Sequence, residues 1–274
     1  MKITARTSGS GPKIILLHGY AGSVSHWREI VPKLEAHYTV VLLNYGPLYL
    51  GREAFSFTSQ VKYLGEWISS QYPNEKVTVA GISFGGALAW GLGLKFPHLV
   101  DKTIFINPMM PAPGQQFHLT SMRLFFTIPL SRKSVYLFLS TSIGGKFLKT
   151  CASIFRLQSE EHASRLTSLE GKRRVLLAHL FNNFAWILKQ EEWSHWHDRL
   201  MTWSHPSLFI YDSEDPLFKA KAYFDLGQIL KSSATLILPG AGHIAIQNAA
   251  EPIAQAILDF TKKQKESLNS KSAA

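Results

Sequence analysis

The sequence has a single cysteine, Cys151, so an intrachain disulfide is impossible. It has no signal-peptide pattern, and its first apolar run, residues 14–17, is far shorter than the ~18 residues of a membrane span. Acidic residues are scarce, since 19 Asp and Glu face 29 Lys and Arg and give a net charge of +10. These absences exclude a disulfide-stapled secreted domain and predict a cytoplasmic protein without stable membrane insertion.

Of the 274 residues, 46% are hydrophobic, so the chain can bury the large hydrophobic core of one domain. Short β-branched runs predict six core strands, at residues 13–17, 39–43, 76–80, 102–106, 207–211 and 234–238. Helices are predicted at residues 25–36, 58–71, 84–95, 219–231 and 246–263. This alternation is typical of an α/β fold with a mostly parallel, doubly wound sheet, to which residues 1–7 add an antiparallel edge strand.

Residues 81–85 read Gly-Ile-Ser-Phe-Gly and lie between a predicted strand and a predicted helix. A Gly-x-Ser-x-Gly sequence at such a junction is typical of a nucleophile elbow, a turn so sharp that only small residues fit two positions before and after the serine. Ser83 is therefore predicted to be a nucleophile with its Oγ above the sheet. A glycine- and serine-rich turn without chemistry is the alternative for this segment alone.

Two further strands end in residues that can activate a serine. His243 follows the run 234–238 and a Pro-Gly-Ala-Gly segment, at the same sheet edge as Ser83, and can act as its general base. An acid after the run 207–211 can orient that histidine, and Asp212, Glu214 and Asp215 are the candidates. The chain order of serine, acid and histidine differs from that of chymotrypsin and subtilisin.

With these motifs, and with residues 16–23 reading Leu-Leu-His-Gly-Tyr-Ala-Gly-Ser, the sequence resembles the α/β-hydrolase fold superfamily. The resemblance is to its cap-bearing branch of serine esterases and extends from about residue 13 to about residue 262. It favours Asp215 as the acid of the triad, since Asp212 at the strand end suits local turn hydrogen bonds better.

The resemblance also implies roles for the residues around the serine. The backbone N–H groups of Tyr20 and Phe84 form the oxyanion hole, and His18 braces the loop that carries Tyr20. Neither a metal nor a cofactor is implied. His195 and His197 are two residues apart and lie on different faces of a helix, so a metal site there is not predicted.

A long insertion separates the fourth and fifth predicted core strands. The resemblance implies that residues 109–205 form a helical cap over a core of residues 1–108 and 206–274. The segment from Met109 to Leu200 holds twelve Lys and Arg against six Asp and Glu. This charge fits either solvated helix faces or recognition of an acidic partner such as an acyl carrier protein. Nucleic-acid binding is not predicted, because no recognition motif accompanies the basic cluster 172–174.

One loop departs from the family pattern. After its second core strand the family places an aspartate and a glycine-rich turn, whereas this chain has Asn44 and a turn containing Pro47 and tyrosines. That loop lies beside the entrance and not in the triad, so the departure concerns the substrate. Ser83 itself counts against the epoxide-hydrolase and dehalogenase branches, which carry an aspartate nucleophile.

The predicted function is hydrolysis of a carboxylic ester or thioester through an acyl-enzyme on Ser83. The resemblance to carboxylesterases and to pimeloyl-carrier methyl ester esterases favours a small-molecule ester with a short or medium acyl chain, free or linked to a carrier protein. A carbon–carbon bond hydrolase or a cofactor-free perhydrolase on the same triad is the first alternative. A non-catalytic binding protein on this scaffold is the second.

Overall fold

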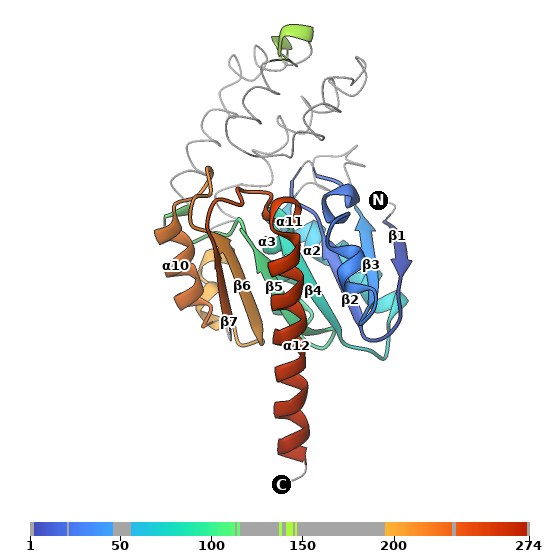
Figure 1. Ribbon diagram of the computed structural model, residues 1–274. Coiled ribbons are helices and arrows are strands. Elements are labelled where there is room, and N and C mark those ends of the chain that lie inside the picture. The colour runs from blue at the N-terminus through green and yellow to red at the C-terminus, as the bar shows by residue number, and fades with distance from the viewer. Residues whose placement is uncertain are drawn as a thin grey trace.

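The computed structural model describes residues 3–20, 22–45, 56–112, 114–115, 137–138, 141–144, 146, 195–231 and 234–272, with side chains as far as residue 262. Its described part is built on a seven-stranded sheet with the order β1-β3-β2-β4-β5-β6-β7 (Figure 1). The strands are β1 (Thr4–Ser8), β2 (Lys13–Leu17), β3 (Thr39–Asn44), β4 (Val77–Ile82), β5 (Val100–Ile106), β6 (Ser207–Asp212) and β7 (Ala234–Leu238). Neighbours pair in parallel except β1, which is antiparallel to β3.

Burial explains why these runs form strands. All six residues of β4 are buried, and β4 pairs with β2 on one side and β5 on the other. A parallel strand covered on both faces needs such a continuous apolar run. The edge strand β1 is mostly exposed, as its polar sequence allows. The six predicted core strands and the antiparallel edge strand are confirmed. The strands predicted at 13–17 and 234–238 have the predicted ends, and the ends of the others differ by at most three residues.

Helices cover both faces of the sheet. On one face, α2 (Phe57–Gln71), α3 (Phe84–Lys95) and α10 (Ala220–Ile229) share a buried cluster with Ile15 and Leu17. On the other, η1 (Val24–Trp27), α1 (Val31–Leu34), α11 (Ala245–Asn248) and α12 (Ala250–Ser272) share a second cluster with Ile14 and Leu16. The alternation along β2 therefore separates the two cores, and the doubly wound α/β architecture is confirmed.

Two predicted helices are interrupted. The prediction of one helix over residues 25–36 is wrong, because the chain forms the 3-10 turn η1 and then the short helix α1. Pro32 lies in the first turn of α1, where its missing N–H has no partner to lose, so it starts a helix and does not continue one. The predicted helix at 246–263 is α11 and α12, separated at Ala249, where φ is −134°.

Both ends of the predicted cap pack into the α/β body. Met109, Met110 and Ala112 after β5 are buried in the same cluster as α2 and α3. So are Trp196, Leu200 and Trp203 around the turn η3 (Leu200–Thr202), and the Trp196 indole donates to Thr58 Oγ1 at 3.0 Å. Most of the predicted cap, including residues 116–136 and 147–194, lies outside the described residues. Its division from the core stays a prediction.

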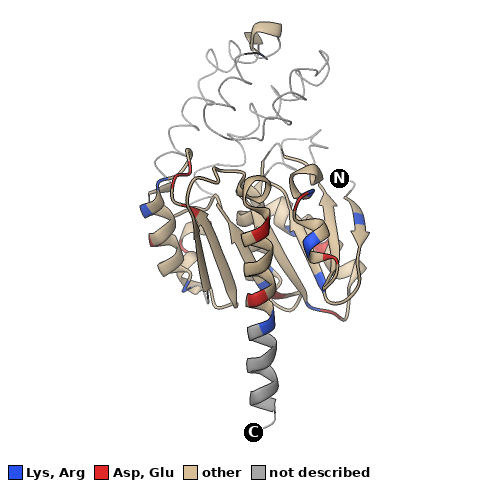
Figure 2. Cartoon of the chain, viewed as in Figure 1, with Lys and Arg blue, Asp and Glu red and all other residues tan. Residues whose placement is uncertain are grey.

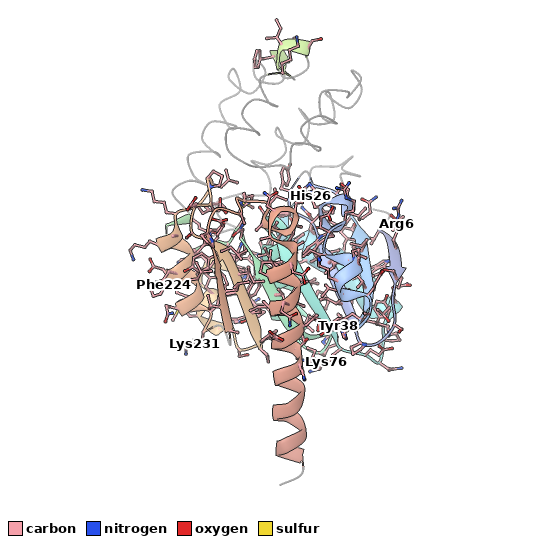
Figure 3. The ribbon with its side chains drawn as sticks, in the orientation of Figure 1. Arg6, His26, Tyr38, Lys76, Phe224 and Lys231 are labelled. Atoms are coloured by element: carbon pink, nitrogen blue, oxygen red, sulfur yellow. The ribbon has the colours of Figure 1, made fainter. Side chains whose placement is uncertain are left out.

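Charge and hydropathy follow this layering. In the described part, charged side chains fall mainly on helices and connecting loops, and β4 carries none (Figure 2). No described helix combines the length and apolar content that crossing a bilayer requires. Figure 3 places His26 near α11, and places Tyr38 and Lys76 at the opposite end of the sheet, where β3 and β4 begin.

Candidate active site

Ser83 lies at the junction of β4 and α3 in a backbone conformation that few residues adopt, with φ 53° and ψ −121°. A Cβ at Gly81 would lie 2.1 Å from the carbonyl oxygen of Gly85, and a Cβ at Gly85 would lie 2.3 Å from that of Leu17. Both positions therefore require glycine. The Ser83 N–H donates to the Ile106 carbonyl at 3.0 Å, so the strained residue is tied to the neighbouring strand.

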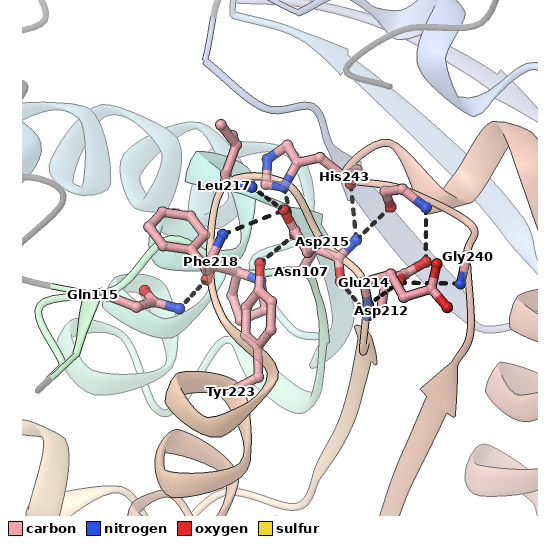
Figure 4. Close-up of polar contacts among 12 residues, drawn as sticks. Asn107, Gln115, Asp212, Glu214, Asp215, Leu217, Phe218, Tyr223, Gly240 and His243 are labelled. Atoms are coloured by element: carbon pink, nitrogen blue, oxygen red, sulfur yellow. Dashed lines mark hydrogen bonds and ion pairs between the residues drawn. The ribbon is translucent and has the colours of Figure 1, made fainter. Parts of the chain in front are cut away.

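Asp215 and His243 meet at the carboxyl ends of β6 and β7. The Nδ1 of His243 lies 2.7 Å from Oδ2 of Asp215, and both side chains are buried (Figure 4). The backbone N–H of Leu217 donates to Asp215 Oδ1 at 2.7 Å, and the Tyr223 hydroxyl donates to Oδ2 at 2.6 Å. Burial raises the pKa of this carboxyl, but the charge of His243 and these hydrogen bonds outweigh burial and lower the pKa below its usual value.

An ionised Asp215 fixes the tautomer of His243. A carboxylate only accepts hydrogen bonds, so in the neutral imidazole of His243 the proton is on Nδ1 and Nε2 keeps its lone pair. Among the described residues, however, no hydrogen bond joins the Ser83 hydroxyl to His243. The structure thus brings the predicted acid and base together and leaves the serine unbonded to them. Such serine–histidine contacts often tighten only when substrate binds.

The loop after β2 lies directly against Ser83. A Cβ at Gly19 would be 3.2 Å from Cβ of Ser83 and 3.7 Å from its Oγ. The rings of Tyr20 and Phe84, the two predicted oxyanion-hole residues, meet edge to face with centroids 5.9 Å apart. Phe84 is the first residue of α3, and no carbonyl in the described part accepts its N–H.

His18 holds this loop in place without being exposed to solvent. Its Nδ1–H donates to the Gly19 carbonyl at 2.8 Å, and its ring stacks on Tyr45 with centroids 4.2 Å apart. The Tyr45 hydroxyl donates in turn to the His18 carbonyl. Burial lowers the pKa of His18 to about 4, so the ring is neutral at pH 7. Tyr45 follows Asn44, in the loop that departs from the family pattern.

Asn107 connects the acid loop to the histidine loop. It is fully buried with φ 41°, and its Nδ2 donates to the carbonyls of Gly242 at 3.0 Å and His243 at 2.9 Å. Its Oδ1 accepts the N–H of Asp212 at 2.7 Å. The Asp212 carboxylate accepts N–H groups from Glu214 at 2.6 Å and Gly242 at 2.7 Å. Asp212 therefore bonds backbone, as predicted, and does so in both loops.

Asn107 and Tyr223 were missed by the sequence reasoning. Asn107 had a usable signal, because a polar residue directly after a buried strand of a parallel sheet lies at the ligand-binding edge. Tyr223 had none, because it lies within α10 and reaches Asp215 only when that helix packs on β6.

His195 and His197, near the end of the predicted cap, belong to no group of three possible metal ligands within the described residues. Nδ1 of His197 contacts the Pro111 carbonyl. Within the described ranges, no three His, Cys, Asp or Glu side chains gather closely enough to hold a metal ion.

Comparison with known proteins gives consistent similarities. The family model described as alpha/beta hydrolase fold matches residues 12–249. A 2-hydroxy-6-oxo-6-(2'-aminophenyl)hexa-2,4-dienoic acid hydrolase of Metapseudomonas resinovorans is 22% identical, over 94% of this chain and 86% of the relative. A pimeloyl-acyl-carrier protein methyl ester esterase of Sodalis glossinidius is 25% identical, over 94% and 96%. The solved structure of an epoxide hydrolase from Vigna radiata matches with a TM-score of 0.73 and 19% identity, over 95% of this chain and 94% of that one.

Proposed function

Because this chain belongs to the alpha/beta hydrolase fold family, we propose that it is a serine hydrolase that cleaves carboxylic esters or thioesters. The observation that carries the proposal is the buried contact between Asp215 Oδ2 and His243 Nδ1 at 2.7 Å. A buried carboxylate that orients a histidine is the arrangement that activates a serine nucleophile. The strained elbow at Ser83 supports the same assignment, since strain of this kind gathers at functional sites.

The proposed reaction proceeds through an acyl-enzyme. His243 takes the proton of Ser83 as Oγ attacks the carbonyl carbon, and the N–H groups of Tyr20 and Phe84 stabilise the tetrahedral oxyanion. The carbon–oxygen or carbon–sulfur bond then breaks, and the leaving alcohol or thiol receives the proton from His243. Water, deprotonated by the same histidine, releases the acid and restores Ser83. Loss of one oxyanion donor lowers kcat by ~10²–10³ in such sites.

Two substrate classes are supported by relatives that span most of this chain. The Sodalis relative is named for a methyl ester linked to acyl carrier protein, and the excess of basic residues between Met109 and Leu200 suits an acidic carrier. The Metapseudomonas relative is named as a hydrolase of a hexadienoic acid, which favours carbon–carbon bond hydrolysis as the second candidate function. We rank the ester first, because the Sodalis relative is the more similar of the two in identity and coverage and the basic residues suit its carrier-linked substrate.

The first test is hydrolysis of p-nitrophenyl esters from acetate to decanoate by the wild type and Ser83→Ala. Wild-type turnover with a clear chain-length optimum is expected, and the variant should lose at least ~10³-fold in kcat because it lacks the nucleophile. A 6-substituted 2-hydroxy-6-oxohexa-2,4-dienoic acid, assayed beside the esters, separates the two candidate functions. Ester turnover that persists in Ser83→Ala would refute the serine mechanism.

A second test separates the two aspartates. Asp215→Asn should lower kcat by ~10³–10⁴, because an amide cannot hold His243 in the required tautomer or stabilise its charged form. Asp212→Asn is the matched control at a neighbouring buried carboxylate. It should lower the melting temperature by weakening backbone hydrogen bonds, with less than a ~10-fold loss of kcat well below that temperature. The reverse pattern would reassign the acid to Asp212.

A further inference from the structure

One oxygen of Asp215 serves two donors. Oδ2 accepts the Nδ1–H of His243 at 2.7 Å and the hydroxyl of Tyr223 at 2.6 Å. The other oxygen, Oδ1, accepts backbone N–H groups from Leu217 at 2.7 Å and Phe218 at 3.4 Å. Tyr223 is fully buried on α10, so bulk solvent does not compete with the carboxylate for its hydroxyl. The side chain that orients the histidine is thus itself held by a phenol (Figure 4).

The shared oxygen has an electrostatic consequence. A hydrogen bond from Tyr223 stabilises the negative charge on Asp215 and draws it away from His243. Less negative charge then faces the imidazole, so its protonated form gains less from the carboxylate. Since the acid and the base interact strongly, the proton they bind belongs to the pair. A hydrogen bond from Tyr223 to the shared oxygen therefore opposes the binding of that proton, whether the proton is on Asp215 or on His243.

Among the described side chains around the Asp215–His243 pair, Tyr223 is the one whose hydrogen bond to Asp215 can be removed without removing a charge. From β6, Asp212 is occupied by backbone N–H groups, and the ring of Tyr211 stacks on Tyr223 at 5.5 Å. On the loop that follows β6, the Phe218 ring lies 6.2 Å from the His243 ring and carries no charge. Burial, followed by the charge of Asp215, raises the pKa of Tyr223 well above its usual value, so its hydroxyl remains a donor across the working pH range.

We propose that Tyr223 is a positioning residue that fixes the Asp215 carboxylate and limits how tightly the Asp215–His243 pair binds a proton. The inference rests on the proposed function, because it deepens the role of the same three residues. By weakening proton binding, Tyr223 keeps His243 available as a base at lower pH. The acid limb of the pH–rate profile is where this effect is measured.

The test is the pH dependence of kcat/KM for Tyr223→Phe, with Tyr211→Phe as the matched control. Phenylalanine keeps the buried ring of Tyr223 and removes only the donor to Asp215. The acid limb should move upward by ~0.5–1 pH unit, because the pair then binds its proton more tightly. Tyr211→Phe removes a neighbouring hydroxyl with no hydrogen bond to Asp215 in the described part, and its limb should stay in place.

A direct titration makes the result independent of turnover. The ring protons of His243, assigned by comparison with His243→Gln, are followed by NMR against pH in the wild type and in Tyr223→Phe. An upward shift in both the titration and the acid limb supports the proposal. A lower kcat with an unmoved limb and titration overturns it and leaves Tyr223 a structural residue. If the wild type hydrolyses no ester, the proposed function fails, and the NMR shift alone decides whether Tyr223 acts on the pair.

Discussion

At the scale of single residues, burial decides the protonation state of His18. Its ring is enclosed between Tyr45 and the loop beside Ser83, and its pKa is lowered from 6.5 to about 4. At a pH between these two values, His18 is protonated in the unfolded chain and neutral in the folded chain. The stability that His18 contributes is therefore fully present above pH 6.5 and is lost as the pH falls toward 4.

This gives a prediction for stability against pH. Across that window the wild type should lose about 3 kcal/mol of unfolding free energy through His18 alone. His18→Phe keeps a ring against Tyr45 and removes the titrating group, so its loss should be smaller by that amount. Urea denaturation of both proteins at pH 7.5 and pH 4 measures the difference, and other titrating groups cancel between them. Equal losses would show that His18 is not buried in the neutral form.

At the scale of elements, the elbow depends on contact between α3 and the loop after β2. Gly85→Ala would place a Cβ 2.3 Å from the Leu17 carbonyl oxygen and 2.5 Å from that of His18. Backbone atoms cannot yield as flexible side chains do, so we expect about 3 kcal/mol of destabilisation and a loop displaced from Ser83.

The measurement combines chemical denaturation with ester turnover. The matched control is Ala89→Gly in the same helix, which opens space at a buried position and costs about 1–2 kcal/mol through helix propensity and a lost methyl group. Gly85→Ala should lose activity beyond its loss of folded protein, and Ala89→Gly should not. Similar behaviour of the two variants would argue against the close packing of the loop on α3.

The elements that were predicted correctly from the sequence are those whose signal lies in a few consecutive residues. β-branched runs and glycine spacing are local, so the core strands and the turn at Ser83 could be read before folding was considered. The prediction of one helix over residues 25–36 was wrong, because Pro32 lies in the first turn of α1 and the chain before it forms the 3-10 turn η1. Tyr223 could not be found locally, because its partner Asp215 depends on how α10 packs on β6.

At the scale of the whole molecule, protection should follow position in the sheet. β4 is buried throughout and has a neighbour on each side, whereas the edge strand β1 is mostly exposed. Amides of β4 should exchange only through global unfolding, and those of β1 at least ~10²-fold faster through local opening. Hydrogen exchange followed by mass spectrometry on peptides from both strands measures this. Equal protection would mean that the sheet opens as one unit.

The long helix α12 has a practical consequence for handling the molecule. It packs on the sheet through buried residues such as Ile253, Ile257 and Phe260, and then runs on past the ends of the strands (Figure 1). That direction leads away from the edge where Ser83 and His243 lie. A linker to a bead or sensor surface at the end of α12 would therefore orient every molecule alike, with the edge that carries Ser83 and His243 turned toward the bulk solution.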